Sequence, residues 1–284
     1  RLAGAKMSET RPRLPDFSNP PVIELALSVQ FEPLSAFRIP HFGLLWSEFR
    51  AEFPRTEEHP PRPAVIEQFG VPRAPKIGVR VEAALLIPQC RLLNAKGTEI
   101  IQIQQDRFVH NWRKVGTGDE YPRYEFVKRR FEGELDTFRQ FVAREGIGEV
   151  VPNQCEVTYV NHIISGEGWE GHGELGEILT VWTTRYSDSF LSEAEDVAFG
   201  VRYIIPGGDG SPLGRLLVST NPAYRTEDNR PIYVLVLTAR GKPISEGIEG
   251  ALGFLDIGRE WIVRGFTSLT SMRMHEIWGR RDAH

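Results

Sequence analysis

The sequence predicts an α+β fold built from two β-α-β(3–4)-α repeats, with antiparallel sheets covered on one face by two long helices. Three observations predict it. A β-rich stretch ends in a long amphipathic helix at about residues 121–144, and a second one ends in another helix at about 245–276. Both halves follow the same order of strand, short helix, meander and long helix, which indicates an internal duplication. Turns rich in glycine and proline separate the strand-like runs.

The predicted boundaries follow from this repeated order. Residues 1–18 are expected to be a disordered leader, in which residues 1–6 precede Met7, the expected natural start. Residues 19–150 form the N-terminal repeat and residues 151–284 the C-terminal repeat. A chain of 284 residues can bury a substantial core, so we expect the repeats to pack together as one globular unit.

The first half opens with a strand at 22–31, where apolar residues alternate imperfectly with polar ones. A short amphipathic helix follows and ends before Pro54. Strand composition then recurs at 64–69, 78–87, 90–94, 99–104 and 107–114. The long helix carries apolar residues in steps of three or four from Tyr124 to Val142, and this stripe should press on the sheet.

The second half repeats the pattern from a strand at 155–164. A short helix or an edge strand is expected at 175–183, and further strands at 196–205, 214–220 and 232–239. The final helix contains Gly250, Gly253, Gly258 and Gly265. Glycine costs about 0.5 to 1 kcal/mol within a helix, so we expect these residues to permit close packing against another backbone, or a bend.

Composition narrows the compartment and the partners. The 34 basic and 38 acidic residues are well mixed and give a net charge of −4, which disfavours nucleic acid as a partner. Cys90 and Cys155 lie far apart in apolar runs and are expected to be buried free thiols, so a reducing, cytoplasmic location is the simpler interpretation. No run approaches the roughly 18 apolar residues of a membrane span.

The chain lacks the local patterns that most enzymes carry. It has no paired-histidine metal signature, no glycine-flanked nucleophilic serine and no phosphate-binding glycine loop, so no metal and no cofactor is expected. The candidate catalytic residues are His162, His275 and Asp106. Hydrogen bonding at a strand end explains His162 equally well, and His275 would suit the negative end of the last helix. The sequence therefore leans away from an enzyme.

The densest cluster of functional side chain types lies between residues 102 and 114. Strand alternation places Arg107, Asn111 and Arg113 on one face, and Trp112 among the residues on the other. Arginine and aromatic side chains together suit an interface hot spot or an anion site, although a salt-bridged outer face remains the alternative. The candidate binding residues are Arg107, Asn111, Trp112, Arg113 and Asn161.

Several segments carry a family resemblance. They are residues 19–24, 104–114, 121–124, 157–163 and 255–266, with His275 and Trp278 near the end. Over roughly residues 19 to 280 the chain resembles a sporadically distributed bacterial family of uncharacterised proteins. The resemblance implies no activity, but a patchy distribution is typical of mobile toxin-antitoxin and phage-defence genes. The element order also resembles the duplicated saddle of TATA-binding-protein-like folds, from which no function follows.

Three functional hypotheses result. The first is a non-enzymatic interaction or regulatory protein of a bacterial conflict module, such as a toxin-neutralising or defence-associated partner, acting through a protein partner or self-association. The second is an enzyme or small-ligand binder with a site between the repeats, at which Asp106, Arg107, Asn161, His162 and His275 would converge. The third is a nucleic-acid binder, which requires a continuous basic face on the saddle.

Overall fold

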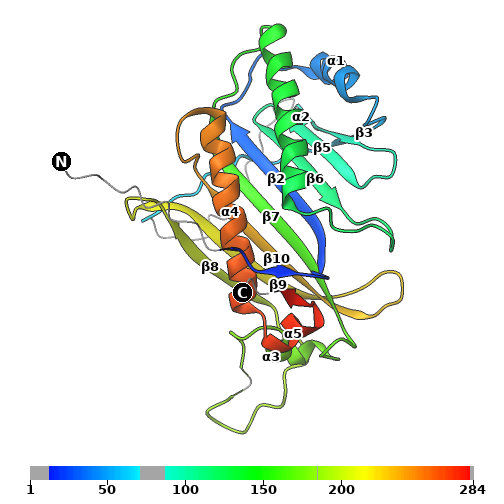
Figure 1. The fold of residues 1–284 in the computed structure, drawn as a ribbon, viewed down its shortest axis with the longest axis vertical. Coiled ribbons are helices and arrows are strands. Elements are labelled where there is room, and N and C mark those ends of the chain that lie inside the picture. The colour runs from blue at the N-terminus through cyan, green and yellow to red at the C-terminus, as the bar shows by residue number, and fades with distance from the viewer. Residues whose placement is uncertain (1–12, 71–86, 184, 282–284) are drawn as a thin grey trace, which may run out of the picture.

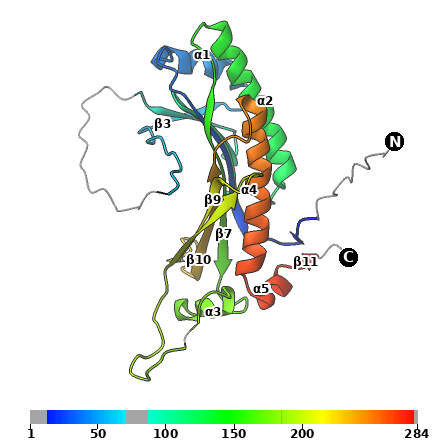
Figure 2. The same cartoon turned by 90° about the vertical axis from the view of Figure 1, so that its left-hand side faces the viewer.

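The computed structural model describes residues 13–70, 87–183 and 185–281, and confirms the predicted α+β class. Its nine-stranded antiparallel sheet carries the two long helices on one face (Figures 1 and 2). The strands are β1 (Asp16–Phe17), β2 (Val22–Phe31), β3 (Arg55–His59), β4 (Gln89–Leu93), β5 (Glu99–Gln104), β6 (Arg107–Arg113), β7 (Pro152–Ile164), β8 (Phe199–Pro206), β9 (Pro212–Tyr224), β10 (Pro231–Gly241) and β11 (Arg280–Arg281). The α-helices are α1 (Ile39–Phe49), α2 (Tyr124–Arg144), α3 (Leu175–Ile178), α4 (Gly247–Leu269) and α5 (Met272–Ile277).

The strand order of the large sheet is β3-β4-β5-β6-β2-β7-β10-β9-β8. The centre is the antiparallel pair β2 and β7, in which Leu25 lies opposite Tyr159 and Leu27 opposite Val157. On each side of this pair, the remaining strands of that half follow in reverse chain order. The run β6-β5-β4 on one side therefore matches β10-β9-β8 on the other. This order is compatible with two repeats that join through their first strands.

The main core lies between the sheet and the long helices. α2 packs on β6 and β2, and α4 packs on β7 and β10. Phe108 of β6 stacks against Phe131 and Phe138 of α2, with ring centroids 6.0 and 5.2 Å apart. The apolar periodicity of both helices therefore faces the sheet, as amphipathic helices of this type require.

The last helical region is divided in two. α4 ends at Leu269, and Ser271 then begins α5, where its hydroxyl accepts a hydrogen bond from the amide of Met274. Capping by serine satisfies an amide that would otherwise lack a helical partner. The predicted single helix to about residue 276 is therefore wrong at this point, since Thr270 and Ser271 have extended backbones.

The ends of the described chain meet beside α5. β1 pairs with β11 in a separate two-stranded sheet, and the Phe17 side chain is buried against Phe266 and Trp278. Residues 16–17 are thus ordered, although the sequence places them in the leader. Residues 1–12 of that leader lie outside the described residues.

The opposite face of the sheet is crossed by residues 60–70, which we call the strap. The strap is extended but pairs with no strand among the described residues, so the strand predicted at 64–69 is wrong. Most of the strand predicted at 78–87 lies outside the described residues. The region at 175–183 contains the short helix α3, one of the two predicted alternatives, followed by an isolated bridge between Leu179 and Thr270.

Candidate functional site

The predicted binding strand β6 is mostly covered. Trp112 is 5% exposed and packs against the ring of Tyr121 beneath the helices, with centroids 5.6 Å apart. Asn111 is also 5% exposed, on the other face, and the Arg113 guanidinium donates to the carbonyl of Gly97. The burial of Trp112 removes it from any surface contact, while Arg107 lies beneath the strap.

The five residues that the second hypothesis brought together lie apart in the fold. Asp106 is in the β5–β6 turn and accepts a hydrogen bond from Gln104. Asn161 and His162 are neighbours on β7 and therefore point to opposite faces of the sheet. His275 is buried in α5, where its Nε2 lies 2.8 Å from the hydroxyl of Thr270. These residues form no common site.

His162 has surroundings of its own. It is partly buried on the open face of β7, and burial lowers the pKa of its imidazole, with Glu227 opposing this effect and Arg225 adding to it. It lies away from the strap, opposite Val234 of β10. Its ring therefore stays neutral at a lower pH than the ring of a free histidine does. His162 alone does not form a catalytic site.

The strap is held by side chains from six consecutive strands of the sheet. In sheet order, the contacts come from Gln104 of β5, Arg107 of β6, Gln30 of β2, Gln154 of β7, Arg240 of β10 and Arg215 of β9. An extended chain advances roughly 3.3 Å per residue and strands lie roughly 4.8 Å apart, so three strap residues cross about two strands. The strap therefore meets each strand in turn, nearly at right angles.

Three glutamines bind the backbone of the strap. The amide of Gln104 bonds both the N–H of Arg62, at 3.1 Å, and its carbonyl, at 2.9 Å. The side-chain oxygen of Gln30 accepts from the N–H of Val65 at 2.9 Å, and that of Gln154 accepts from the N–H of Glu67 at 3.0 Å. These amides thus replace the backbone groups of a neighbouring strand.

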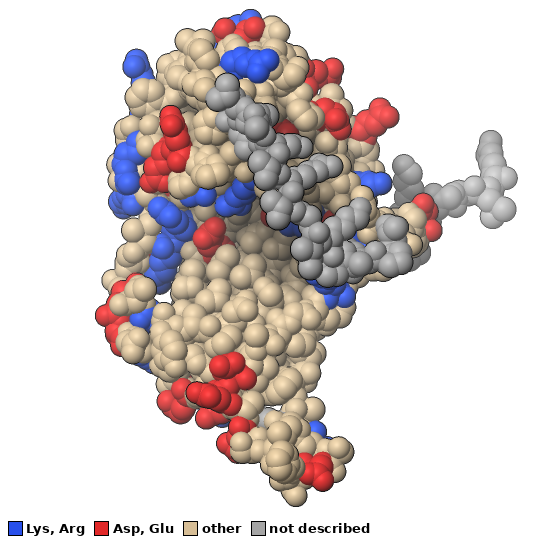
Figure 3. All heavy atoms as spheres, turned by 180° about the vertical axis from the view of Figure 1, so that it is seen from behind, with Lys and Arg blue, Asp and Glu red and all other residues tan. Residues whose placement is uncertain are grey.

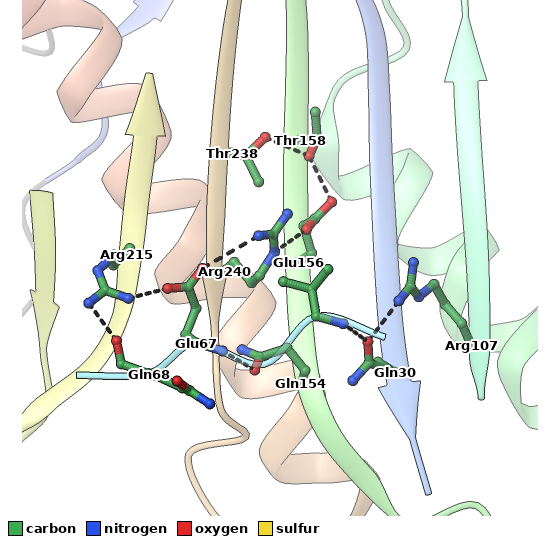
Figure 4. A network of polar contacts seen from close by, with 11 residues as sticks. Gln30, Glu67, Gln68, Arg107, Gln154, Glu156, Thr158, Arg215, Thr238 and Arg240 are labelled. Atoms are coloured by element: carbon green, nitrogen blue, oxygen red, sulfur yellow. Dashed lines mark hydrogen bonds and ion pairs between the residues drawn. The ribbon is translucent and has the colours of Figure 1, made fainter. Parts of the chain in front are cut away.

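The strap ends in a buried ion network (Figure 4). The Glu67 carboxylate is 1% exposed and pairs with Arg215 of β9 and Arg240 of β10. Arg240 also donates to Glu156 of β7 at 2.5 Å. Arg215 donates in addition to the carbonyl of Gln68 at 2.7 Å. A carboxylate buried to this extent requires such cationic partners, because an unpaired charge would be expelled to water.

Figure 3 shows the open face of the sheet. Basic and acidic side chains are mixed over the upper part of this face, and a broad area without charged side chains lies below them. On β7, β10 and β9, two neighbouring rows of paired residues are uncharged. Thr158, Thr238 and Leu217 form one row, and Val160, Val236 and Ser219 form the next. The visible face therefore lacks the continuous basic surface that the third hypothesis requires.

A large cavity lies on the other side of the sheet, between α2, α4 and the residues around β1. Its volume is about 670 Å³. Its lining residues come from both halves of the chain and include Tyr121, Tyr159, Asn161, Arg259 and Phe266. A cavity of this size suits a small organic ligand. The sequence anticipated a site between the halves, but of the residues proposed for it only Asn161 appears among the described lining.

The tyrosines of this cavity stay protonated. The hydroxyls of Tyr121 and Tyr159 lie 3.0 Å apart, and burial raises the pKa of Tyr159 to about 12. Burial also raises the pKa of Tyr121 and of Tyr124 well above the usual range. The three phenols can therefore donate hydrogen bonds but do not act as bases near neutral pH.

The described part of the chain carries neither a cluster of metal ligands nor a membrane-spanning helix. No group of three or more histidine, cysteine or acidic side chains is placed to hold a metal ion there. None of the helices in residues 13–70, 87–183 and 185–281 has the length and apolar character of a membrane span. Comparisons with models of protein families, with curated proteins and with solved structures found no match for the chain.

Proposed function

We propose that the protein is a non-enzymatic interaction protein whose open sheet face binds an extended acidic segment of a partner protein. In the free chain the strap occupies this site, the row of side chains that runs from Gln104 of β5 to Arg215 of β9, which we call the groove. The observation that carries the proposal is the pattern of strap contacts: the hydrogen bonds and ion pairs described between sheet and strap end on the strap backbone or on the Glu67 carboxylate.

This pattern supports exchange of one occupant for another. Backbone N–H and C=O groups are the same in every extended segment, so Gln104, Gln30 and Gln154 can bind other sequences equally well. The Arg215 and Arg240 pair adds one requirement, a carboxylate at the position of Glu67. The groove thus selects for an extended backbone and a single negative charge.

The outer surface of the strap adds further support. Val65 and Ile66 are 37% and 50% exposed. The apolar side chain of the strap that packs on the sheet is therefore the partly buried Phe69, whose ring centroid lies 4.3 Å from the guanidinium carbon of Arg215. Hydrogen bonds contribute only about 0.5 to 1.5 kcal/mol each to stability, because water competes for the same groups. The strap is therefore held mainly by its covalent connection to the chain and by the ion pairs of Glu67. A competing segment with its own carboxylate could replace Glu67 in these ion pairs.

The partner expected from the sequence belongs to a bacterial conflict module, such as a toxin or a defence-associated protein. Within this proposal, the partner is recognised by its chemistry. It presents an extended segment with an Asp or Glu side chain. Self-association by exchange of straps between two copies meets the same description.

The test uses the strap as a separate ligand. Residues 61–70 are synthesised as a fluorescent peptide, and its binding is measured by anisotropy to the wild-type chain and to the variant Glu67→Lys. The lysine repels Arg215 and Arg240 and frees the groove, whereas in the wild type the tethered strap competes at an effective concentration of about millimolar. We expect the variant to bind the peptide at least tenfold more tightly than the wild type.

A matched peptide in which glutamine replaces the glutamate serves as the control. It should bind the Glu67→Lys chain at least tenfold more weakly, because it lacks the charge that the two arginines bind. Equal affinity of the two peptides, or no binding to either chain, would refute the proposal.

Hydrogen exchange in the wild-type chain provides a second test that does not depend on folding of a variant. A strap that leaves its groove exposes the amides of Val65 and Glu67, so these should exchange much faster than the paired amides of β2 and β7. Exchange as slow as that of the central strands would mean that the strap is a fixed part of the fold, and the proposal would fail.

A further inference from the structure

The cavity between the helices lies on the face of the sheet opposite the strap. Its lining joins Tyr121 and Tyr124, from the start of α2, to Arg259, Ile262 and Phe266 of α4. The sheet contributes Tyr159 and Asn161 of β7 and Leu237 of β10. Both halves of the chain therefore build one chamber, independently of the groove beneath the strap.

This chamber offers both polar and apolar groups. Leu237, Ile262 and Phe266 supply apolar surface, whereas the hydroxyls of Tyr121 and Tyr159 meet at 3.0 Å beside them. Asn161 is 1% exposed, and its amide nitrogen donates to the carbonyl of Leu235 at 3.1 Å. A ligand with an apolar body and a polar end matches such a lining.

Positive charge predominates around the polar part. The lining contains four arginines and two acidic residues: Arg13, Arg123, Arg259 and Arg281, with Asp16 and Glu125. Arg259 lies over the ring of Tyr124, with 4.8 Å from its guanidinium carbon to the ring centroid, and pairs with Glu125 at 2.8 Å. With 28% of its side chain exposed and a place in the cavity lining, Arg259 can bind an acceptor in the cavity in addition to Glu125.

The backbone at the start of α2 is strained beside the same chamber. Arg123 has a φ of 73°, a conformation that a residue other than glycine rarely adopts. Its Nη1 donates to Asp16 at 3.0 Å and to the carbonyl of Phe17 at 3.1 Å, which fixes the β1 wall of the cavity. Strain of this kind persists where surrounding contacts enforce it, and it clusters at binding sites.

We infer that this cavity binds a small amphiphilic anion, with its apolar body against Leu237, Ile262 and Phe266 and its anionic end at Arg259 and the Tyr121–Tyr159 hydroxyl pair. A single carboxylate on an alkyl or aromatic body has the required chemistry. The guanidinium supplies charge-assisted hydrogen bonds, and the hydroxyl that accepts within the Tyr121–Tyr159 pair can donate its own proton to the same anion. The site is distinct from the strap groove, so neither proposal rests on the other.

Calorimetric titration with dodecanoate, kept below its micelle concentration, tests this inference. Dodecyltrimethylammonium serves as the probe with the same chain and opposite charge. We expect one dodecanoate to bind per chain and no saturable binding of the cation. Failure of dodecanoate to bind, or equal binding of both amphiphiles, would overturn the assignment, since the inferred site attracts an anion through Arg259.

Variants on one helix locate the site. Arg259→Met keeps an unbranched apolar stem but removes the guanidinium and its charge, and should weaken dodecanoate binding at least tenfold. Arg264→Met, on the same helix but outside the cavity lining, should change it less than twofold. Tyr159→Phe removes only a hydroxyl and provides the second readout if Arg259→Met does not fold; unchanged affinity in both lining variants overturns the assignment. Glu67→Lys should leave dodecanoate binding unchanged, which separates this result from that of the strap experiment.

Discussion

Nδ1 of His110 on β6 lies 2.6 Å from a carboxylate oxygen of Glu134 on α2, and the two side chains are 0% and 7% exposed. This buried contact fixes α2 against the sheet. Glu134→Leu leaves the imidazole without this partner, and a buried unsatisfied polar group costs about 1 to 3 kcal/mol. We expect the free energy of unfolding in urea to fall by that amount.

Glu132→Leu is the matched control, because Glu132 lies on the same helix with 38% of its side chain exposed. Its effect should stay within about 0.5 kcal/mol. Glu134→Gln, which retains a hydrogen-bonding oxygen, should lie between the two. Equal losses for Glu134→Leu and Glu132→Leu would show that the His110 contact contributes nothing.

The helix-covered face of the sheet was predictable because its signals are local. Apolar residues three or four apart mark α2, and strict alternation correctly divides Phe108 from Arg107 on β6. The burial of Trp112 depends instead on where Tyr121 lies after the chain turns. Alternation identifies a face, but it does not say which face a helix will cover.

The strap could not be predicted, because its stabilising contacts are distant in sequence. Val65 and Ile66 have strand composition, yet their side chains are exposed, and the N–H of Val65 donates to the side chain of Gln30 instead of to a strand backbone. Glu67 meets Arg215 across 148 positions of sequence. The one available signal was the presence of glutamines such as Gln30 and Gln154 at strand positions that proved to be buried.

The two free cysteines are predicted to react slowly. Burial raises the pKa of the Cys90 thiol to about 11, with a smaller contribution from Glu58, and that of Cys155 to about 12. The thiolate is the reactive form, so at neutral pH both should resist iodoacetamide in the folded chain and react fully in urea. Mass spectrometry counts the modified sites; rapid labelling of Cys155 without denaturant would contradict this prediction.

Stability should fall at high pH through the buried phenol of Tyr159. Its pKa is raised from 10.0 to about 12 by burial, so the folded chain keeps a proton that the unfolded chain releases between these values. The stabilisation is therefore complete below about pH 10 and is lost as the pH rises to about 12, a change of roughly 2 to 3 kcal/mol. Urea titrations at stepped pH should show a smaller decline over this window for Tyr159→Phe than for the wild type, whereas identical declines would exclude the assignment.

Two helical glycines should respond in opposite directions to alanine. A Cβ at Gly258 of α4 would lie 3.1 Å from Cγ2 of Val157 and 3.2 Å from Cβ of Ala239, so these side chains or α4 must shift by a few tenths of an ångström. Overpacking of this kind costs about 1 to 3 kcal/mol, more than the gain of about 1 kcal/mol in helix propensity. A Cβ at Gly133 of α2 meets nothing within 4 Å, so Gly133→Ala should stabilise the chain by about 0.5 to 1 kcal/mol. Thermal melts of both variants measure the contrast; a Gly258→Ala chain as stable as Gly133→Ala would show that α4 does not need its glycine to approach the sheet.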